Sequence, residues 1–189
     1  MKLNDARGGA ARQRVVLALQ ILVVAIPLLG MGLYLLNPFG ADSYDPRQRI
    51  LGHAPYRMPS RSMAPTLKPG QIVLMRAGHH HRHLPERGEL VIYRSPEDEN
   101  PWIQRVVGLP GEQVAIEDGR VTINGRPLNE EYLDPANVGT EYSRWMHVMT
   151  VPQRQYLLLG DNRDNSMDGR LQGTIPHERL LGKVVLVLP

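Results

Sequence analysis

The sequence predicts a mostly β domain tethered to one N-terminal transmembrane helix. Three observations support this prediction: one long uncharged apolar run near the N-terminus, a series of short Val- and Ile-rich runs after residue 70, and 18 Gly with 16 Pro in 189 residues. Short apolar runs that alternate with turn residues are typical of β-sheets. We therefore expect strands that close on themselves as sheets or a partial barrel.

Residues 15–36 read VVLALQILVVAIPLLGMGLYLL and carry no charge. A helix of this length crosses a hydrocarbon core of roughly 30 Å. The residues before it hold four bases and one acid: Lys2, Arg7, Arg12, Arg14 and Asp5. The positive-inside rule therefore predicts a single-pass protein of the cytoplasmic membrane, with residues 1–14 in the cytoplasm and the rest outside. The alternative is a cleaved signal peptide, but its apolar core usually spans only about 7–15 residues before a small-residue cleavage site.

The remainder divides into a polar linker and one folded domain. Residues 37–55 are rich in turn residues and predict a tether, and residues 56–189 predict the extracytoplasmic domain. We expect strands over seven ranges: Gln71–Met75, Glu89–Tyr93, Trp102–Gly108, Gln113–Glu117, Arg120–Ile123, Gln155–Leu159 and Lys183–Leu188. Asp118-Gly119 and Asn124-Gly125 predict two tight hairpin turns. Residues 130–143 show no periodic pattern and predict a loop.

Composition excludes several functional classes. The net charge is only +3 and the bases are scattered, so the sequence argues against nucleic acid as a partner. No cysteine is present, which excludes a disulfide scaffold and a thiol nucleophile. The cluster His79–His83 has four His in five residues. It predicts a solvated loop with adventitious metal affinity, with a zinc or base role as the alternative, and no second ligand cluster completes a metal site. No cofactor is expected.

Three segments carry the functional signal. They are PSRSMAPTL at 59–67, QRVVGLPGE at 104–112 and GDNRDNSMDGR at 160–170. Taken alone, the first is a Ser/Pro-rich turn and the third is a polar turn. In this order, after a membrane span, they closely resemble the signature segments of type I signal peptidases, the bacterial leader peptidase family of serine/lysine-dyad peptidases.

The resemblance implies roles for the two serines of the first segment. Ser62 matches the family nucleophile, and Ser60 matches the serine whose hydroxyl binds the oxyanion together with the backbone N–H of Ser62. Pro59 and Pro65 stiffen the loop, and a nucleophile must be held at attack distance. The family more often has Gly where this chain has Arg61.

The second segment departs from the family at its most important position. Where the family carries its general-base lysine, this chain has Gln104. An amide can hydrogen-bond Ser62 but cannot usefully accept its proton. The only three lysines are Lys2, Lys68 and Lys183, of which Lys183 opens the last predicted strand. Three alternatives remain: a slow or unconventional peptidase, an inactive relative that still binds signal peptides or a secretion partner, and a lysine replaced deliberately to trap substrate.

The third segment implies a scaffold behind the site. By resemblance, Ser166 hydrogen-bonds the base and here would face Gln104. Four charged residues would form ion pairs behind it: Arg105, Asp161, Asp168 and Arg170. Such groups hold the geometry of the reacting residues.

The resemblance also implies the substrate, namely signal peptides of exported preproteins cut after a small-x-small motif. An extended peptide added to a sheet edge presents alternate side chains to two shallow pockets. We expect the stretches before Ser62 and before Gln104 to flank that edge, close to the lipid bilayer and the secretion translocon. Four side chains could contact lipid or pack in the core: Trp102, Trp145, Met146 and Met149. A self-cleaving regulator such as an SOS-response repressor is a weaker alternative, because a membrane span precedes the domain.

Overall fold

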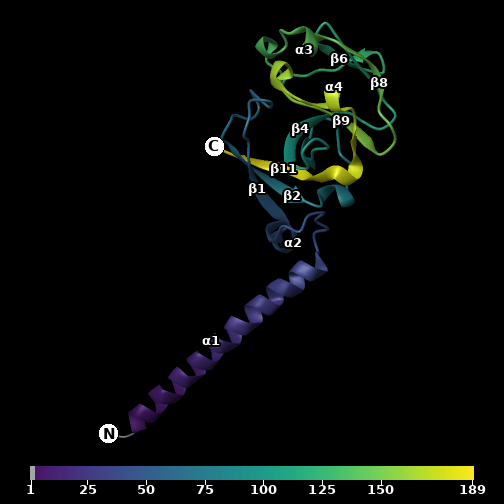
Figure 1. The fold of residues 1–189 in the computed structure, drawn as a ribbon. Coiled ribbons are helices and arrows are strands. Elements are labelled where there is room, and N and C mark those ends of the chain that lie inside the picture. Colours follow the sequence, from purple (N-terminus) through teal and green to yellow (C-terminus); the bar gives the residue numbers. More distant parts are fainter. Residues whose placement is uncertain (1–2) are drawn as a thin grey trace. The chain divides into compact units, whose positions relative to one another are not determined.

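The computed structural model describes the backbone of residues 3–189 and the side chains from residue 12 on (Figure 1). The chain divides after Pro38 into two compact units. The first is the helix α1, Leu3–Leu36, with Pro27 inside it. Its segment Arg12–Leu36 is long and apolar enough to cross a membrane, and none of that apolar stretch is buried within the protein. The predicted helix is therefore present. Lys2, one of the bases used to predict the orientation, lies outside the described residues.

The second unit begins at Phe39, so the structure differs from the predicted tether over 37–55. Helix α2, Pro46–Leu51, lies inside that range, and strand β1, His53–Arg57, begins within it. Asp45 caps α2 by accepting the backbone N–H of Arg47, Pro46 takes the first helical position, and Gly52 ends the helix at a φ of 69°. These three residue types are ordinary at helix ends. In a short polar segment they are also typical of a linker, so the sequence pattern did not distinguish the two.

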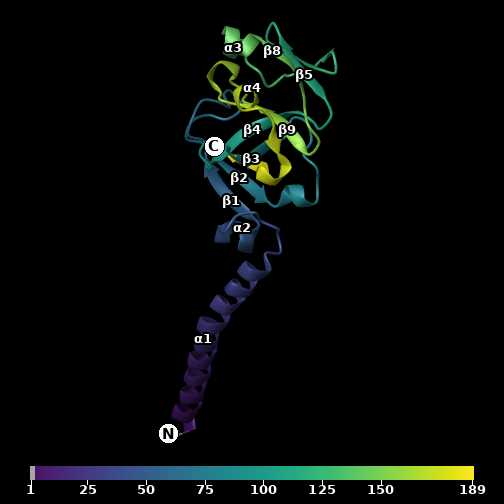
Figure 2. The same ribbon diagram turned by 45° about the vertical axis from the view of Figure 1, so that its right-hand side comes forward.

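Seven strands form one antiparallel sheet that curls as a half-barrel (Figures 1 and 2). Their order across the sheet is β1-β2-β11-β3-β4-β9-β10. Besides β1, the strands are β2 Ile72–Ala77, β3 Leu90–Arg94, β4 Pro101–Gly108, β9 Gln155–Leu159, β10 Ile175–Pro176 and β11 Leu180–Leu188. Strand β11 joins the β1–β2 hairpin to β3, so segments far apart in sequence build one sheet.

Four strands form a second antiparallel sheet in the order β7-β6-β5-β8. They are β5 Gln113–Glu117, β6 Arg120–Ile123, β7 Arg126–Pro127 and β8 Met146–Thr150. Both predicted turns are present, with positive φ at both central residues of each turn: 49° and 78° at Asp118-Gly119, 51° and 76° at Asn124-Gly125. Strand β8 was not predicted. Its pairing with β5 shifts register between Val114 and Ile116, which breaks the two-residue alternation that marks a strand.

Short helices fill the connections. They are η1 His79–His81, η2 Pro135–Asn137, α3 Glu141–Arg144, η3 Arg163–Asn165, α4 Gly169–Gln172 and η4 His177–Arg179. The predicted loop at 130–143 therefore contains η2 and the start of α3. Thr140 caps α3 by accepting the backbone N–H of Ser143.

Three clusters of buried apolar residues make up the core of this unit. Strand β4 contributes to all of them, because Ile103, Val106 and Val107 each lie in a different cluster. A strand buried on both faces is held rigidly, since every side chain along it packs against a neighbour. Gln104 lies in this strand, so its backbone position is set by the core.

The two hairpin turns supply a matched test of the fold. A Cβ on Gly119 would lie 2.6 Å from Val138 Cγ1, whereas a Cβ on Gly125 would meet nothing within 4 Å. Both substitutions place alanine at a left-handed φ, which costs about 1–2 kcal/mol. Overpacking adds roughly 1–3 kcal/mol at Gly119 alone. We expect Gly119→Ala to lower the free energy of unfolding more than Gly125→Ala, measured by urea denaturation in detergent micelles. Equal losses would contradict the described packing of residue 138 on the turn.

Candidate functional site

The loop that follows β1 carries Ser60 and Ser62 with their hydroxyls together. The two Oγ atoms are 3.0 Å apart, and the backbone N–H of Ser62 points to Ser60 Oγ at 3.3 Å. Met63 and Leu67 are fully buried and anchor the loop in the core. The Leu67 N–H donates to the carbonyl of Met63 at 2.8 Å, which closes a tight turn. A short loop tied down at buried residues presents its serines in one geometry.

The third segment holds this loop from the other side. The backbone N–H of Asn162 donates to the carbonyl of Ser62 at 2.9 Å. Thr66 donates its hydroxyl to Asp161 Oδ2 at 2.5 Å. Gly160 leaves no room for a side chain, because a Cβ there would lie 2.6 Å from the carbonyl oxygen of Ser62 and 2.2 Å from Ser166 Oγ. The segment after β9 therefore determines where Ser62 lies.

Gln104 is 2% exposed and both ends of its amide have partners. Its Nε2 donates to the carbonyl of Met167 at 2.7 Å, and its Oε1 accepts the hydroxyl of Tyr93 at 2.9 Å. Burial raises the pKa of Tyr93, with the charge of Asp168 adding to the shift. Tyr93 therefore stays protonated as the donor, and it offers no base to the site.

The resemblance implies a hydrogen bond between Ser166 and residue 104, but the structure does not have this bond. Ser166 Oγ is buried and has no partner within the described residues. It packs against Gly160, while the Ser166 carbonyl accepts the hydroxyl of Tyr142 at 3.0 Å. The carbonyl of Met167 takes the place that Ser166 was expected to fill beside Gln104.

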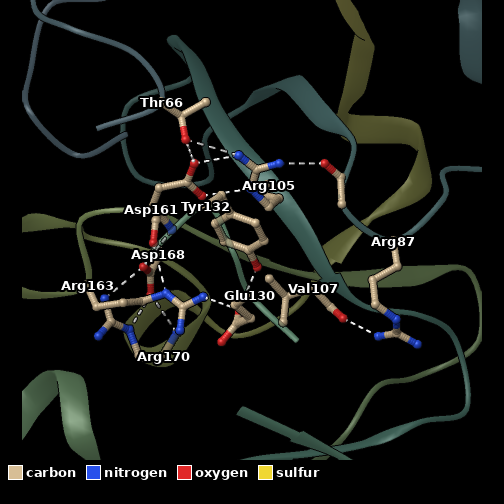
Figure 3. Close-up of polar contacts among 12 residues, drawn as sticks. Thr66, Arg87, Arg105, Val107, Glu130, Tyr132, Asp161, Arg163, Asp168 and Arg170 are labelled. Carbon is tan, nitrogen blue, oxygen red and sulfur yellow. Dashed lines mark hydrogen bonds and ion pairs between the residues drawn. The ribbon is translucent and has the colours of Figure 1, made fainter. Parts of the chain in front are cut away.

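Figure 3 shows the ion pairs behind the serine loop. Arg105 binds Asp161 through Nε at 2.8 Å and Nη2 at 2.5 Å, and Arg170 binds Asp168 through Nε and Nη2 at 2.8 Å each. Both carboxylates are fully buried. The four charged residues predicted to form a scaffold therefore do pair. Breaking one buried pair by removing a partner typically costs about 3–5 kcal/mol.

Asp168 and Arg105 also tie the scaffold to neighbouring elements. Asp168 accepts the backbone N–H of Gly160 at 3.0 Å and caps α4. Arg105 donates to the carbonyl of Gly88 at 2.8 Å, and its guanidinium lies 3.8 Å from the ring centroid of Tyr132 (Figure 3). The ion pairs thus fix strand β4, the third segment and the serine loop as one unit.

A cleft of about 370 Å³ lies in front of these residues. Its wall consists of three segments: residues 56–60 with Ser62, residues 101–104, and Asn165 with Met167. Ser62 and Gln104 therefore share one cavity. Among the described residues that line the cleft, Arg57 is the one with a permanently charged side chain, and none is an Asp or Glu.

Two open strand edges lie in the wall of the cleft. Strand β1 is the edge of the large sheet, and β2 is its one partner among the described strands. Strand β4 pairs with β9 only from Arg105 on, so on that side residues 101–104 have no neighbouring strand in the part of the chain that the structure describes. Open edges of this kind bind extended peptides by main-chain hydrogen bonds.

Comparison with known proteins shows the family of the chain. Residues 48–188 match the family model described as "Signal peptidase, peptidase S26". The chain belongs to this signal peptidase family.

Two relatives show the extent of the similarity. The signal peptidase I of Leptolyngbya laminosa is 36% identical over 137 residues, covering 68% of this chain and 65% of its own length. The probable signal peptidase I-2 of a Synechocystis strain is 38% identical over 133 residues, covering 67% of this chain and 58% of its own. The chain thus spans less than two thirds of either relative. A crystal structure of a signal peptidase I from Enterococcus faecalis superposes with a TM-score of 0.48 at 30% identity, covering 55% of this chain and 98% of that one.

Three residues that hold the site together were not predicted as part of it: Tyr93, Arg163 and Glu130. Tyr93 holds Gln104 from the adjacent strand β3. Arg163 is fully buried and donates to the Gly160 carbonyl at 3.0 Å and to Glu130 Oε1 at 2.6 Å. Arg163 lies within the third segment, so the sequence contained a reason to include it in the site. Nothing in the sequence marks Glu130, which lies in the predicted loop.

The alternative bases lie away from the cleft. Lys183 Nζ is paired with Glu89, and Lys68 is exposed. In the His cluster, burial lowers the pKa of His80 to about 4 and its Nδ1 lies 3.3 Å from the carbonyl of His83. Over the described residues, no group of three His, Asp or Glu is arranged to hold a metal ion. Neither these histidines nor these lysines line the cleft.

The four side chains considered for lipid contact differ in environment. Trp102 is half-buried in the cleft wall, with its ring edge-to-face on Tyr93 at 6.5 Å between centroids. Met146 and Met149 pack against the core of the small sheet, so core packing is the correct interpretation for them. Trp145 is 58% exposed.

Gly160 provides the test of how the serine loop is held. We expect Gly160→Ala to lower the free energy of unfolding by about 1–3 kcal/mol, because the new Cβ collides with the Ser62 carbonyl and the Ser166 hydroxyl. Gly139→Ala is the matched control, since its Cβ would meet Asp164 Oδ2 at an ordinary 3.4 Å. Urea unfolding of both variants in detergent decides the comparison. If the two lose the same stability, the third segment does not constrain the loop as described.

Proposed function

We propose that this chain is a membrane-anchored serine endopeptidase that removes signal peptides from exported preproteins. Ser62 attacks the peptide bond that follows a small-x-small motif. The observation that carries this proposal is the convergence of a pinned serine loop, Gln104 and two open strand edges on one cleft. Membership of the signal peptidase family supports the same reaction.

Substrate recognition follows from the cleft wall. A signal peptide enters as an extended strand between β1 with the residues after it and residues 101–104 of β4. Alternate side chains of such a strand point the same way, so two of them face the wall. Met58 and Ile103 are buried in that wall and Trp102 is half-buried, which leaves shallow apolar surface suited to small side chains.

The chemistry of attack relies on the two serines. Ser62 Oγ adds to the substrate carbonyl carbon, and the negative charge that develops on its oxygen is bound by the Ser60 hydroxyl and the Ser62 N–H. Each donor aimed at that oxygen contributes about 3–4 kcal/mol of transition-state stabilisation in comparable sites. The proton of Ser62 has no good acceptor, because within the described part of the cleft wall there is no amine, imidazole or carboxylate. General-base catalysis contributes about 10²–10⁴-fold, so we expect slow turnover.

The proposed location of the chain is the cytoplasmic membrane. Helix α1 anchors the chain as a single span with its N-terminus in the cytoplasm, and the peptidase unit lies outside, close to the bilayer and the secretion translocon. The apolar length of residues 12–36 supports the anchor. The basic residues that precede it support the orientation.

A second function is favoured by one specific observation. The Gln104 amide accepts a hydrogen bond from the Tyr93 hydroxyl and donates one to the Met167 carbonyl. The side chain at the position where the family has its base is therefore held in place by hydrogen bonds at both ends. A site built this way suits a protein that binds signal peptides, or a secretion partner, without cutting them.

A preprotein cleavage assay with the full chain in detergent separates the two functions. We expect slow cleavage by the wild type, loss of cleavage in Ser62→Ala, and a rise of roughly 10²-fold or more in Gln104→Lys, because a lysine there restores a base. Gln113→Lys is the control for added charge, since Gln113 is exposed on β5.

The outcomes assign the function directly. Cleavage only after Gln104→Lys identifies the chain as a binding protein of the signal peptidase fold. No cleavage by any variant, together with no binding of the preprotein, contradicts both functions.

A further inference from the structure

We propose that the cleft binds peptides ending in a free carboxylate, such as released signal peptides, more tightly than the same peptides with an uncharged end. This inference rests on the proposed function, because it takes the cleft to be the signal-peptide site. It goes beyond that function by naming the product, rather than the uncut chain, as the preferred ligand.

The first step is the orientation of the Gln104 amide. The Met167 carbonyl can only accept, so the nitrogen end of the amide must face it. The oxygen end then faces the Tyr93 hydroxyl, which donates. An amide nitrogen has two N–H donors, and the Met167 carbonyl uses one of them. Gln104 therefore has one N–H left to offer to the cleft that it lines, while its acceptor is already engaged.

The second step is the set of donors beside that N–H. The hydroxyls of Ser60 and Ser62 lie 3.0 Å apart in the same wall, and the N–H of Ser62 donates to Ser60 Oγ at 3.3 Å. A carboxylate has two oxygens that accept about four hydrogen bonds, whereas an amide end has one acceptor and two donors. A carboxylate end can accept hydrogen bonds from all of the donors around Ser62, whereas an amide end has only one acceptor for them.

The third step is charge. Among the described residues that line the cleft there is one Arg, Arg57, and no Asp or Glu, so the lining residues carry a net positive charge. A carboxylate placed at Ser62 gains this attraction together with charge-assisted hydrogen bonds, which are about twice as strong as neutral ones. A neutral amine at position 104 would offer a lone pair that accepts a proton, whereas the remaining N–H of the Gln104 amide can only donate. The inferred site therefore suits an anion better than a group that must give up a proton.

Tyr93 is the positioning residue in this arrangement. It is fully buried, and its hydroxyl keeps the oxygen end of the amide turned away from the cleft. Without that hydroxyl, the oxygen of Gln104 is left buried without its donor, and a rotated amide would present an acceptor to the carboxylate. We expect Tyr93 to affect the choice between peptide ends rather than the binding of the peptide body.

The test uses the full chain in detergent micelles and three fluorescent peptides with one apolar sequence ending in Ala-Leu-Ala. The first has a free carboxylate, the second a C-terminal amide, and the third continues for several residues and is checked to be intact by mass spectrometry. We expect the carboxylate peptide to bind roughly tenfold or more tightly than the amide peptide, since hydrogen bonds to a charged group are strong. Raised salt should narrow the difference.

Variants locate the effect. Gln104→Leu and Tyr93→Phe should lower the ratio of the two affinities several-fold, because only the serine hydroxyls and Arg57 then still favour the carboxylate. Tyr156→Phe is the matched control, because Tyr156 is another buried tyrosine and does not line the cleft. Thermal unfolding of each variant shows whether it is folded, and Gln104→Asn is a second, smaller change that keeps the amide but withdraws it from Tyr93.

The outcomes are distinct. Equal affinities for the carboxylate and amide peptides in the wild type, with the extended peptide still bound, overturn this inference and leave the proposed function standing. A ratio of affinities in folded Gln104→Leu that is as large as in the wild type also overturns it. Failure of all three peptides to bind overturns the proposed function itself.

Discussion

The site depends on one backbone hydrogen bond, from the N–H of Asn162 to the carbonyl of Ser62. It joins two segments that are a hundred residues apart in sequence. The buried pair Arg105–Asp161 lies beside it and also binds Thr66 of the serine loop, so the bond does not act alone. A buried ion pair with its hydrogen bonds satisfied tolerates little displacement, because any shift leaves a charge unpaired. The serine hydroxyl is therefore presented by a rigid frame.

That frame is intact around a residue that cannot act as a base. Gln104 occupies a strand buried on both faces, and its amide is held at both ends. In the proposed reaction, the residues that bind the peptide and stabilise the oxyanion are thus separate from the group that would remove a proton. Positioning and electrostatic stabilisation each contribute to catalysis without a base, which explains how one fold can serve either a slow peptidase or a binding protein.

The sequence predicted the parts of the fold that local patterns encode. Strands β5, β6 and β9 have the predicted bounds, because Val- and Ile-rich runs end at clear turn residues. Helix α2 and strand β1 were missed, since a capped six-residue helix followed by a short strand resembles a linker. The charged scaffold was predicted by resemblance to the signal peptidases. The contact of Tyr93 with Gln104 was not predicted. It depends on the register between β3 and β4, and no local sequence pattern shows which tyrosine of a neighbouring strand reaches residue 104.

Hydrogen–deuterium exchange at the Asn162 amide tests the central claim most directly, with single-residue resolution on the full chain in detergent. The account predicts exchange that requires global or near-global unfolding, as slow as that of core strand amides, while the amide of the exposed Arg61 exchanges quickly. Rapid exchange at Asn162, close to that of Arg61, would contradict the claim that the third segment holds the serine in place.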